Sequence, residues 1–307
     1  MTEEPSTPGW APAPEPTSTY LARLGRRSAQ TGTVLCVGLD PDPASLPDGF
    51  GQDLAGIERF ARLVLEAAVP FAAAVKPNLA FFEAFGSAGI AALERLRGGI
   101  PADVPVIMDA KRGDIGTTAA RQAVALFDAL GADAVTVNPY LGGDAVAPLI
   151  ERLDRFAYVL CRTSNAGAAE LQSLRVAAER GDGGEDGENA PEEPLYARVA
   201  RRVQGWGPGG TVGLVVGATA PSELREIRAI APGLAFLVPG VGAQGGEIGP
   251  VLRDGQATAD PGRAGAGGGL LVNISRGIAA AAADASDPGE AMAANAREWA
   301  ARLPVLP

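Results

Sequence analysis

The chain has 307 residues, of which 47% are hydrophobic and 5% aromatic, a composition typical of a globular protein with a sizeable core. Its formal net charge of −10 argues against broad attraction to nucleic acid or to an anionic membrane, so we expect neither as a partner. Because histidine is absent, His-based triads, His-containing zinc sites and imidazole acid–base chemistry are excluded. Lys, Arg, Asp, Glu, Ser and Thr must therefore carry any catalysis.

Residues 1–17 are rich in Pro, Thr and Glu and hold few large apolar groups, which predicts a disordered leader. This stretch lacks the basic and apolar regions of a signal peptide, and no apolar run of the chain reaches membrane-spanning length. Cys36 and Cys161 lie in apolar runs, which favours buried free thiols over a disulfide or a nucleophile. We therefore expect a cytoplasmic protein.

From Tyr20 onward, short apolar runs of strand type alternate with longer segments of helical spacing. The predicted strands are 33–39, 71–75, 104–108, 133–137, 157–161, 212–216, 235–238 and 270–274. The predicted helices are 54–69, 87–98, 115–130, 143–153, 194–204, 221–230, 244–253 and 287–302. Eight such β-then-α units predict an α/β fold, a single-domain (β/α)8 TIM barrel over residues 18–307. A doubly wound open sheet is the alternative.

Two segments interrupt this alternation. Residues 181–193 are acidic and Gly-rich, residues 254–269 are rich in Gly and Ala, and both are predicted to be mobile surface insertions. The second lacks the G-x-x-x-x-G-K-[ST] pattern and precedes a strand, which argues against a phosphate-binding loop.

The hexapeptide Asp109-Ala-Lys-Arg-Gly-Asp114 follows the third predicted strand, at the barrel end where active sites lie. In an extended strand Asp109 and Lys111 project to the same face, and Lys76 would add a second ammonium group from the neighbouring strand. With Asp114 at the start of the next helix, two lysines and two aspartates would form an alternating network, in which the flanking carboxylates keep each lysine protonated. It suits a reaction that develops a carbanion and then needs a proton, with Lys111 as the donor.

Three other interpretations of these residues stay open. The network could be a purely structural ion-pair cluster, and Lys111 could instead form a Schiff base, although nearby carboxylates oppose the neutral amine that this needs. Asp114, taken alone, could be a helix N-cap.

A phosphate site is predicted after strands 7 and 8. Four glycines, Gly240, Gly242, Gly245 and Gly246, allow close backbone approach after Pro239, and Arg276 supplies a cation capable of bidentate binding. Barrels often hold phosphate with these two loops and a helix N-terminus.

With these residues assembled, the chain resembles the orotidine 5′-phosphate decarboxylases, in particular the longer bacterial form of mycobacteria and related actinobacteria. The resemblance runs from about Tyr20 to the C-terminus. It rests on Val37-Gly-Leu-Asp40, Lys76-Pro-Asn78, Asp109-Ala-Lys-Arg-Gly-Asp-Ile-Gly116 with Thr118, Arg162-Thr-Ser-Asn165, Pro239-Gly-Val-Gly-Ala-Gln244 and Ser275-Arg-Gly277.

The resemblance implies a homodimer that converts orotidine 5′-monophosphate to UMP and CO2 in pyrimidine synthesis, with no metal or organic cofactor. It implies that Lys111 protonates C6 of the pyrimidine and that Asp109 lies against the departing carboxylate. It also implies that Lys76 and Asp40 bind the ribose and that Ser164 contacts the pyrimidine. The phosphate would be bound by Gln244 and Arg276, beside Pro239 and Gly240. Asp114, Ile115 and Thr118 would enter the partner's site. Two alternatives are a magnesium-dependent decarboxylase of a phosphorylated keto sugar acid and a non-catalytic barrel that binds a phosphorylated ligand.

Overall fold

The computed structural model describes residues 18–177, 192–259 and 265–306. Within them, eight parallel strands form one sheet in the order β2-β1-β10-β9-β8-β5-β4-β3. The strands are β1 Leu35–Leu39, β2 Ala74–Pro77, β3 Ile107–Arg112, β4 Ala134–Val137, β5 Phe156–Arg162, β8 Val212–Val216, β9 Ala235–Pro239 and β10 Leu271–Ile274. Parallel bridges between Val75 and Val106 and between Asn78 and Asp109 join β2 to β3. This closure confirms the (β/α)8 barrel and excludes the open sheet.

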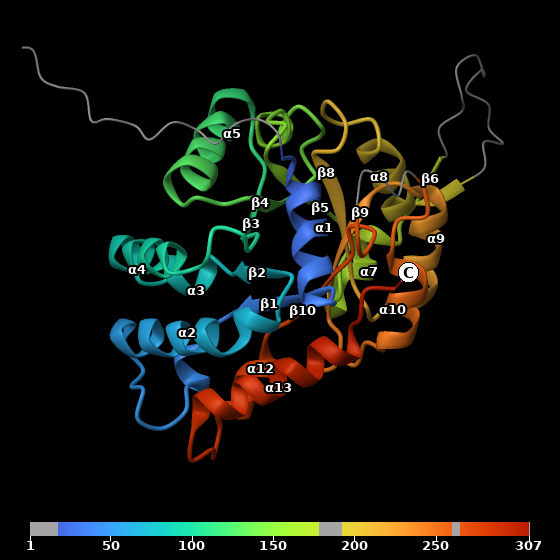
Figure 1. Ribbon diagram of the computed structural model, residues 1–307. Coiled ribbons are helices and arrows are strands. Elements are labelled where there is room, and N and C mark those ends of the chain that lie inside the picture. Colours follow the sequence, from blue (N-terminus) through green and yellow to red (C-terminus); the bar gives the residue numbers. More distant parts are fainter. Residues whose placement is uncertain (1–17, 178–191, 260–264, 307) are drawn as a thin grey trace, which may run out of the picture.

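Helices surround the strands, as Figure 1 shows for α2, α4, α5, α9, α10 and α13. The helices are α1 Tyr20–Thr31, α2 Leu54–Ala68, α3 Ala80–Glu83, α4 Gly86–Gly98, α5 Gly116–Ala123, α6 Ala147–Ile150, α7 Ala169–Gln172, α8 Leu195–Val203, α9 Pro221–Ile230, α10 Ile248–Gly255, α12 Arg276–Ala279 and α13 Pro288–Arg302. Short 3-10 turns cover Pro43–Ser45, Val69–Phe71, Ala166–Ala168 and Ala280–Ala282, and a π-helix, Val124–Ala129, extends α5. Alternate strand residues such as Val37, Val135 and Val159 point outward and pack beneath these helices in the main core.

Helix α1 lies across the strands in Figure 1 and seals one end of the barrel. The Thr19 side chain caps its start by accepting from the Ala22 N–H, and Gly32 ends it in the left-handed conformation. The buried Tyr20 ring stacks on Phe156 with centroids 4.8 Å apart, and its hydroxyl lies 3.1 Å from the Tyr158 hydroxyl. Because these aromatic side chains fill the barrel at the amino ends of the strands, a ligand can enter only at the carboxyl ends, where the predicted active site lies.

Both cysteines are free and buried, as predicted. Burial raises the pKa of the Cys36 thiol to about 12, and burial also raises the pKa of Cys161. Neither thiol is a nucleophile at neutral pH.

Several predicted boundaries were wrong. The run 71–75 was predicted as a strand, but its start belongs to the 3-10 turn and β2 begins at Ala74. Predicted strand 104–108 is displaced in the same direction, to Ile107–Arg112. Strand ends are set by pairing with neighbours, as Gly38 on β1 pairs with Lys76 and Leu39 with Pro77. Lys76 and Asp109 therefore lie inside strands instead of after them.

The predicted leader lies outside the described residues, as do residues 181–191 of the first predicted insertion and residues 260–264 of the second. A two-stranded antiparallel sheet pairs β6 Arg175–Ala177 with β7 Glu192–Pro194, and β7 includes the last two residues of the first predicted insertion. At the end of the second, Gly267 is buried, and a Cβ added to it would lie 3.0 Å from Val34 Cγ1. Across the described residues, none of the helices combines the length and the hydrophobicity that a membrane span requires.

Candidate active site

Asp109 is the centre of a charged network at the carboxyl end of β3. Its Oδ2 lies 2.6 Å from Lys76 Nζ and its Oδ1 lies 2.6 Å from Lys111 Nζ. Only 12% of the Asp109 side chain and 5% of the Lys76 side chain are exposed, whereas Lys111 is half exposed. Asp109 and Lys76 therefore form the buried part of the network, and the ammonium group of Lys111 is the part that a ligand can reach.

The charges of this network hold one another in the ionised state. Burial opposes ionisation of Asp109, but the Lys76 and Lys111 ammonium groups outweigh it and hold the pKa of that carboxyl well below its usual range. Burial likewise opposes the charge on Lys76, yet Asp109 and Asp40 raise the pKa of its ammonium group above the ordinary value. Both groups are charged throughout the neutral range.

The backbone at Lys111 differs from the extended strand that the sequence analysis assumed. Lys111 has a φ of +48°, in the left-handed region that non-glycine residues seldom adopt. The pairing of β3 with β4 is also irregular, because it passes from Met108 opposite Val135 to Arg112 opposite Val137. The side chains of Asp109 and Lys111 still meet, but a bulge brings them together instead of simple alternation.

A cavity of about 460 Å3 opens above the network. Its walls are Lys76, Asp109, Lys111, Thr136, Leu160, Thr163, Ser164, Asn165, Gln172, Val215, Leu237, Pro239 and Gln244. Charged groups thus form one wall, and apolar side chains of β5, β8 and β9 form another, which suits a flat ring with polar edges.

A smaller cavity of about 80 Å3 adjoins the first, since Pro239 and Gln244 line both. Its other walls are Asp40, Gly240, Val241, Ala243, Asn273, Ile274, Ser275, Arg276 and Gly277. Among the described residues, no carboxylate lies within ion-pair distance of Arg276, so its guanidinium is available to an anion. Asp40 Oδ1 is buried and accepts no hydrogen bond from the residues that the structure describes, so it can accept one from a ligand hydroxyl.

Gly240 is needed where the two cavities meet. Its φ is +96°, and a Cβ at this position would lie 2.9 Å from Gln244 Oε1 and 3.1 Å from Ser164 Cβ. The glycine therefore allows the predicted pyrimidine contact, Ser164, and the predicted phosphate contact, Gln244, to approach each other.

Asp114, Ile115 and Thr118 line neither cavity. Ile115 and Thr118 are exposed, and Ile115, not Asp114, is the N-cap of α5. The Asp114 carboxylate accepts from the Ile115 N–H at 2.8 Å. Of the predicted phosphate-loop glycines, only Gly240 lines a cavity, and Gly242, Gly245 and Gly246 line neither. The remaining predicted site residues surround the two cavities of a single chain: Asp40, Lys76, Asp109, Lys111, Ser164, Pro239, Gln244 and Arg276.

Three polar residues that line the cavities were not predicted: Thr136, Gln172 and Asn273. Asn165 also lines the larger cavity, and it was named only as part of the motif from Arg162 to Asn165. Gln172 accepts from the Thr163 N–H and donates to the Thr163 hydroxyl, which braces the loop that carries Ser164. Thr136 and Asn273 each interrupt an apolar strand with one polar residue, and this was the signal that could have revealed them.

The small number of lysines in the sequence was a second signal of the site's position. Lys76 and Lys111 are the only lysines in the chain, since every other basic residue is arginine. Both contact one carboxylate, so any lysine-specific probe of the side chains reports on this site alone.

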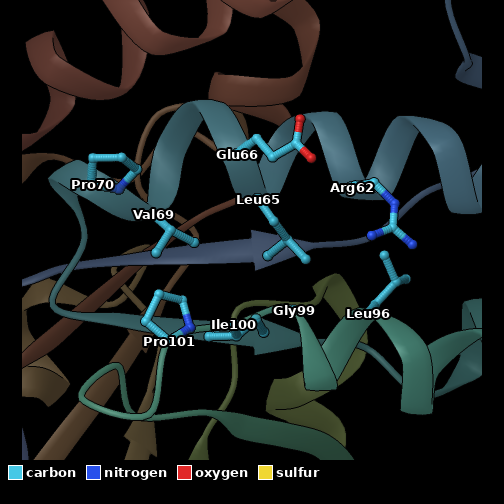
Figure 2. A pocket seen from close by; sticks show the side chains of 9 residues that line it. All are labelled: Arg62, Leu65, Glu66, Val69, Pro70, Leu96, Gly99, Ile100 and Pro101. Carbon is cyan, nitrogen blue, oxygen red and sulfur yellow. The ribbon is translucent and has the colours of Figure 1, made fainter.

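A third cavity, of about 220 Å3, lies between α2 and the end of α4 (Figure 2). Leu65, Val69, Leu96 and Ile100 line it, and its only charged residues are Arg62 and Glu66. It shares no residue with the two cavities at the strand ends. Its apolar walls lack the converging charged groups of those cavities.

Comparison with known proteins agrees with this geometry. Residues 33–292 match the family described as "Orotidine 5'-phosphate decarboxylase / HUMPS family". The orotidine 5′-phosphate decarboxylase of Roseiflexus castenholzii is 46% identical over 285 residues, 92% of this chain and 95% of the relative. That of Thermomicrobium roseum is 45% identical over 281 residues, 91% of this chain and 92% of the relative.

Among solved structures, the OMP decarboxylase of Leishmania donovani superposes with a TM-score of 0.72 at 40% identity, and the match covers 92% of this chain and 95% of the other. These relatives do not support the magnesium-dependent or non-catalytic alternatives, while the narrower resemblance to the longer actinobacterial form stays a prediction. The chain therefore belongs to the orotidine 5′-phosphate decarboxylase / HUMPS family.

Proposed function

We propose that this chain is an orotidine 5′-phosphate decarboxylase, a carboxy-lyase that converts orotidine 5′-monophosphate to UMP and CO2 in pyrimidine biosynthesis. The observation that carries the proposal is the buried Asp109 carboxylate held between two ammonium groups at the base of a ring-sized cavity. The reaction in cells would take place in the cytoplasm and would need no cofactor.

The substrate would span the two adjoining cavities. Its pyrimidine ring fits the larger cavity beside Ser164, and its phosphate fits the smaller one, where Gln244 donates a hydrogen bond and Arg276 supplies the cation. The ribose would lie between them, where the unpartnered Asp40 Oδ1 can accept from a hydroxyl.

The chemical step places a negative charge on C6 of the ring. The bond from C6 to the carboxylate breaks, CO2 leaves, and the electron pair that stays on C6 takes a proton from Lys111 Nζ. Lys111 both stabilises the charge and supplies the proton, because its ammonium group is fixed 2.6 Å from Asp109 and is half exposed to the cavity. The lysine regains a proton from water after turnover.

Lys76 has a different role from Lys111. It is buried, and Asp109 and Asp40 favour its charged form, so it would hold its proton through the cycle and orient Asp109. The same carboxylate environment disfavours the neutral amine that a Schiff base requires.

We further propose a homodimer in which Asp114, Ile115 and Thr118 enter the site of the second copy. Support comes from the exposed apolar side chains of Ile115, Tyr140 and Leu141. They lie on the loops that follow β3 and β4, two strands whose side chains line the larger cavity. A second copy that covered these side chains would remove them from water.

The test is direct. Purified protein is incubated with orotidine 5′-monophosphate in the presence of a chelator, and UMP is measured by chromatography. We expect turnover by the native protein and by Arg62→Ala, a control that removes an exposed cation of α2, and almost none by Lys111→Ala. Equal rates for native protein and Lys111→Ala would refute the role of Lys111, and no turnover by the native protein would refute the function.

A further inference from the structure

The bulge in β3 removes part of the backbone ladder beside the charged network. Between the pairs Met108–Val135 and Arg112–Val137, β3 advances by more residues than β4 does. At this bulge the N–H groups of Ala110 and Lys111 both bond to one side chain. The conformation that presents Lys111 thus depends on that side chain.

The side chain in question is that of Thr136, in the middle of β4. Its hydroxyl accepts from the Ala110 N–H and the Lys111 N–H, both at 3.0 Å, and donates to Asp109 Oδ1 at 2.9 Å. One donor and two acceptor sites are all that a hydroxyl offers, and each is used. Thr136 is 2% exposed, so water does not replace these bonds at low cost.

We propose that Thr136 is a positioning residue, which fixes the Asp109 carboxylate and the left-handed Lys111 relative to each other. This inference rests on the decarboxylase function proposed above. Thr136 acts through its neighbours: it orients the oxygen that Lys111 Nζ contacts and anchors the backbone from which Lys111 projects. Without it, the φ of +48° at Lys111 loses its principal restraint, and the ammonium group becomes free to leave its position over the ring.

Three variants separate this role from simple packing. Thr136→Val keeps the shape of the side chain and removes the hydroxyl, whereas Thr136→Ser keeps the hydroxyl. Thr211→Val is the matched control, because Thr211 is also buried and precedes a strand, but its hydroxyl has no partner in the described structure. Thr136→Ala replaces the Val variant if that protein does not fold.

Steady-state kinetics give the first measurement. A catalytic group displaced by about 1 Å costs on the order of 100-fold, so we expect kcat of Thr136→Val to fall by about 100-fold while KM changes by less than about threefold. Thr136→Ser and Thr211→Val should keep kcat within about threefold of the native value. A kcat for Thr136→Val within that range, or an equal loss in Thr136→Ser, would overturn the proposal.

The two-lysine composition supplies a second measurement that needs no activity. Protein labelled with [15N]lysine has two backbone amide signals, from Lys76 and Lys111. The Lys111 signal should shift and exchange faster with solvent in Thr136→Val, and should keep its native position in Thr136→Ser and Thr211→Val. An unmoved Lys111 signal in Thr136→Val would overturn the proposal even if the native protein failed to decarboxylate its substrate, so the two hypotheses fail separately.

Discussion

Replacement of Lys76 by methionine should destabilise the protein strongly, although the two side chains have similar volumes. Lys76 is buried, and its Nζ contacts Asp109 Oδ2 at 2.6 Å. Removing one partner of a buried pair typically costs about 3–5 kcal/mol, because the other charge stays in the interior. Since Lys111 and Thr136 still contact Asp109 Oδ1, we expect the lower end, about 3 kcal/mol, at pH 7.

The pH dependence has a definite sign. Asp109 has a depressed pKa in the folded protein, so its contribution is present above the unfolded value of about 4 and is lost as the pH falls below it. Lys76 has a raised pKa, so its contribution is present below about pH 10 and is lost as the pH rises further. The network's contribution to the native protein should thus be constant between these limits.

Equilibrium urea unfolding, followed by circular dichroism, measures the free energy of unfolding of the native protein and of Lys76→Met. Assays at pH 6, 7, 8 and 9 test whether the network's contribution is constant over this range. Arg62→Met is the control, because Arg62 is half exposed and pairs with Glu58 at 3.5 Å, which should be worth less than about 0.5 kcal/mol. A loss below about 1 kcal/mol for Lys76→Met would show that the buried Asp109 charge does not need Lys76 to remain stable in the folded barrel.

Two further predictions concern substrate binding and assembly. Arg276→Ala should raise KM by about 10- to 100-fold, since it removes charge-assisted bonds worth about 1.5–3 kcal/mol, and activity on orotidine itself, which lacks phosphate, should not change. An equal effect on both substrates would contradict phosphate binding. Lys111→Ala and Asp114→Ala should each be inactive alone. When the two variants are mixed and exchange subunits, about half of the dimers contain one subunit of each kind, and such a dimer has one complete site out of two. The mixture should therefore recover about a quarter of native activity. No recovery in subunit-exchanged mixtures would refute the shared site.

The order of strands and helices followed from the sequence because each unit has a local signature. Apolar runs such as 212–216 and the helical spacing of 221–230 depend on periodicity alone, and β8 and α9 have these bounds. The count of such units then determined the barrel, since closure satisfies both edges of the sheet. The absence of histidine and the hexapeptide from Asp109 to Asp114 limited the chemistry in the same local way.

Tertiary structure decided the strand ends and the arrangement of the site. The bulge at Lys111 is held by Thr136, 25 residues farther along the chain, and no local pattern around Lys111 contains that contact. Gly240 lies between Ser164 and Gln244 because β5 and β9 flank β8, a neighbour relation that arises only when the sheet assembles. The sequence by itself determined which residue types and which periodic elements are present, because these are local properties. The barrel determined which side chains meet, because contacts between residues distant in the sequence arise only when the chain folds.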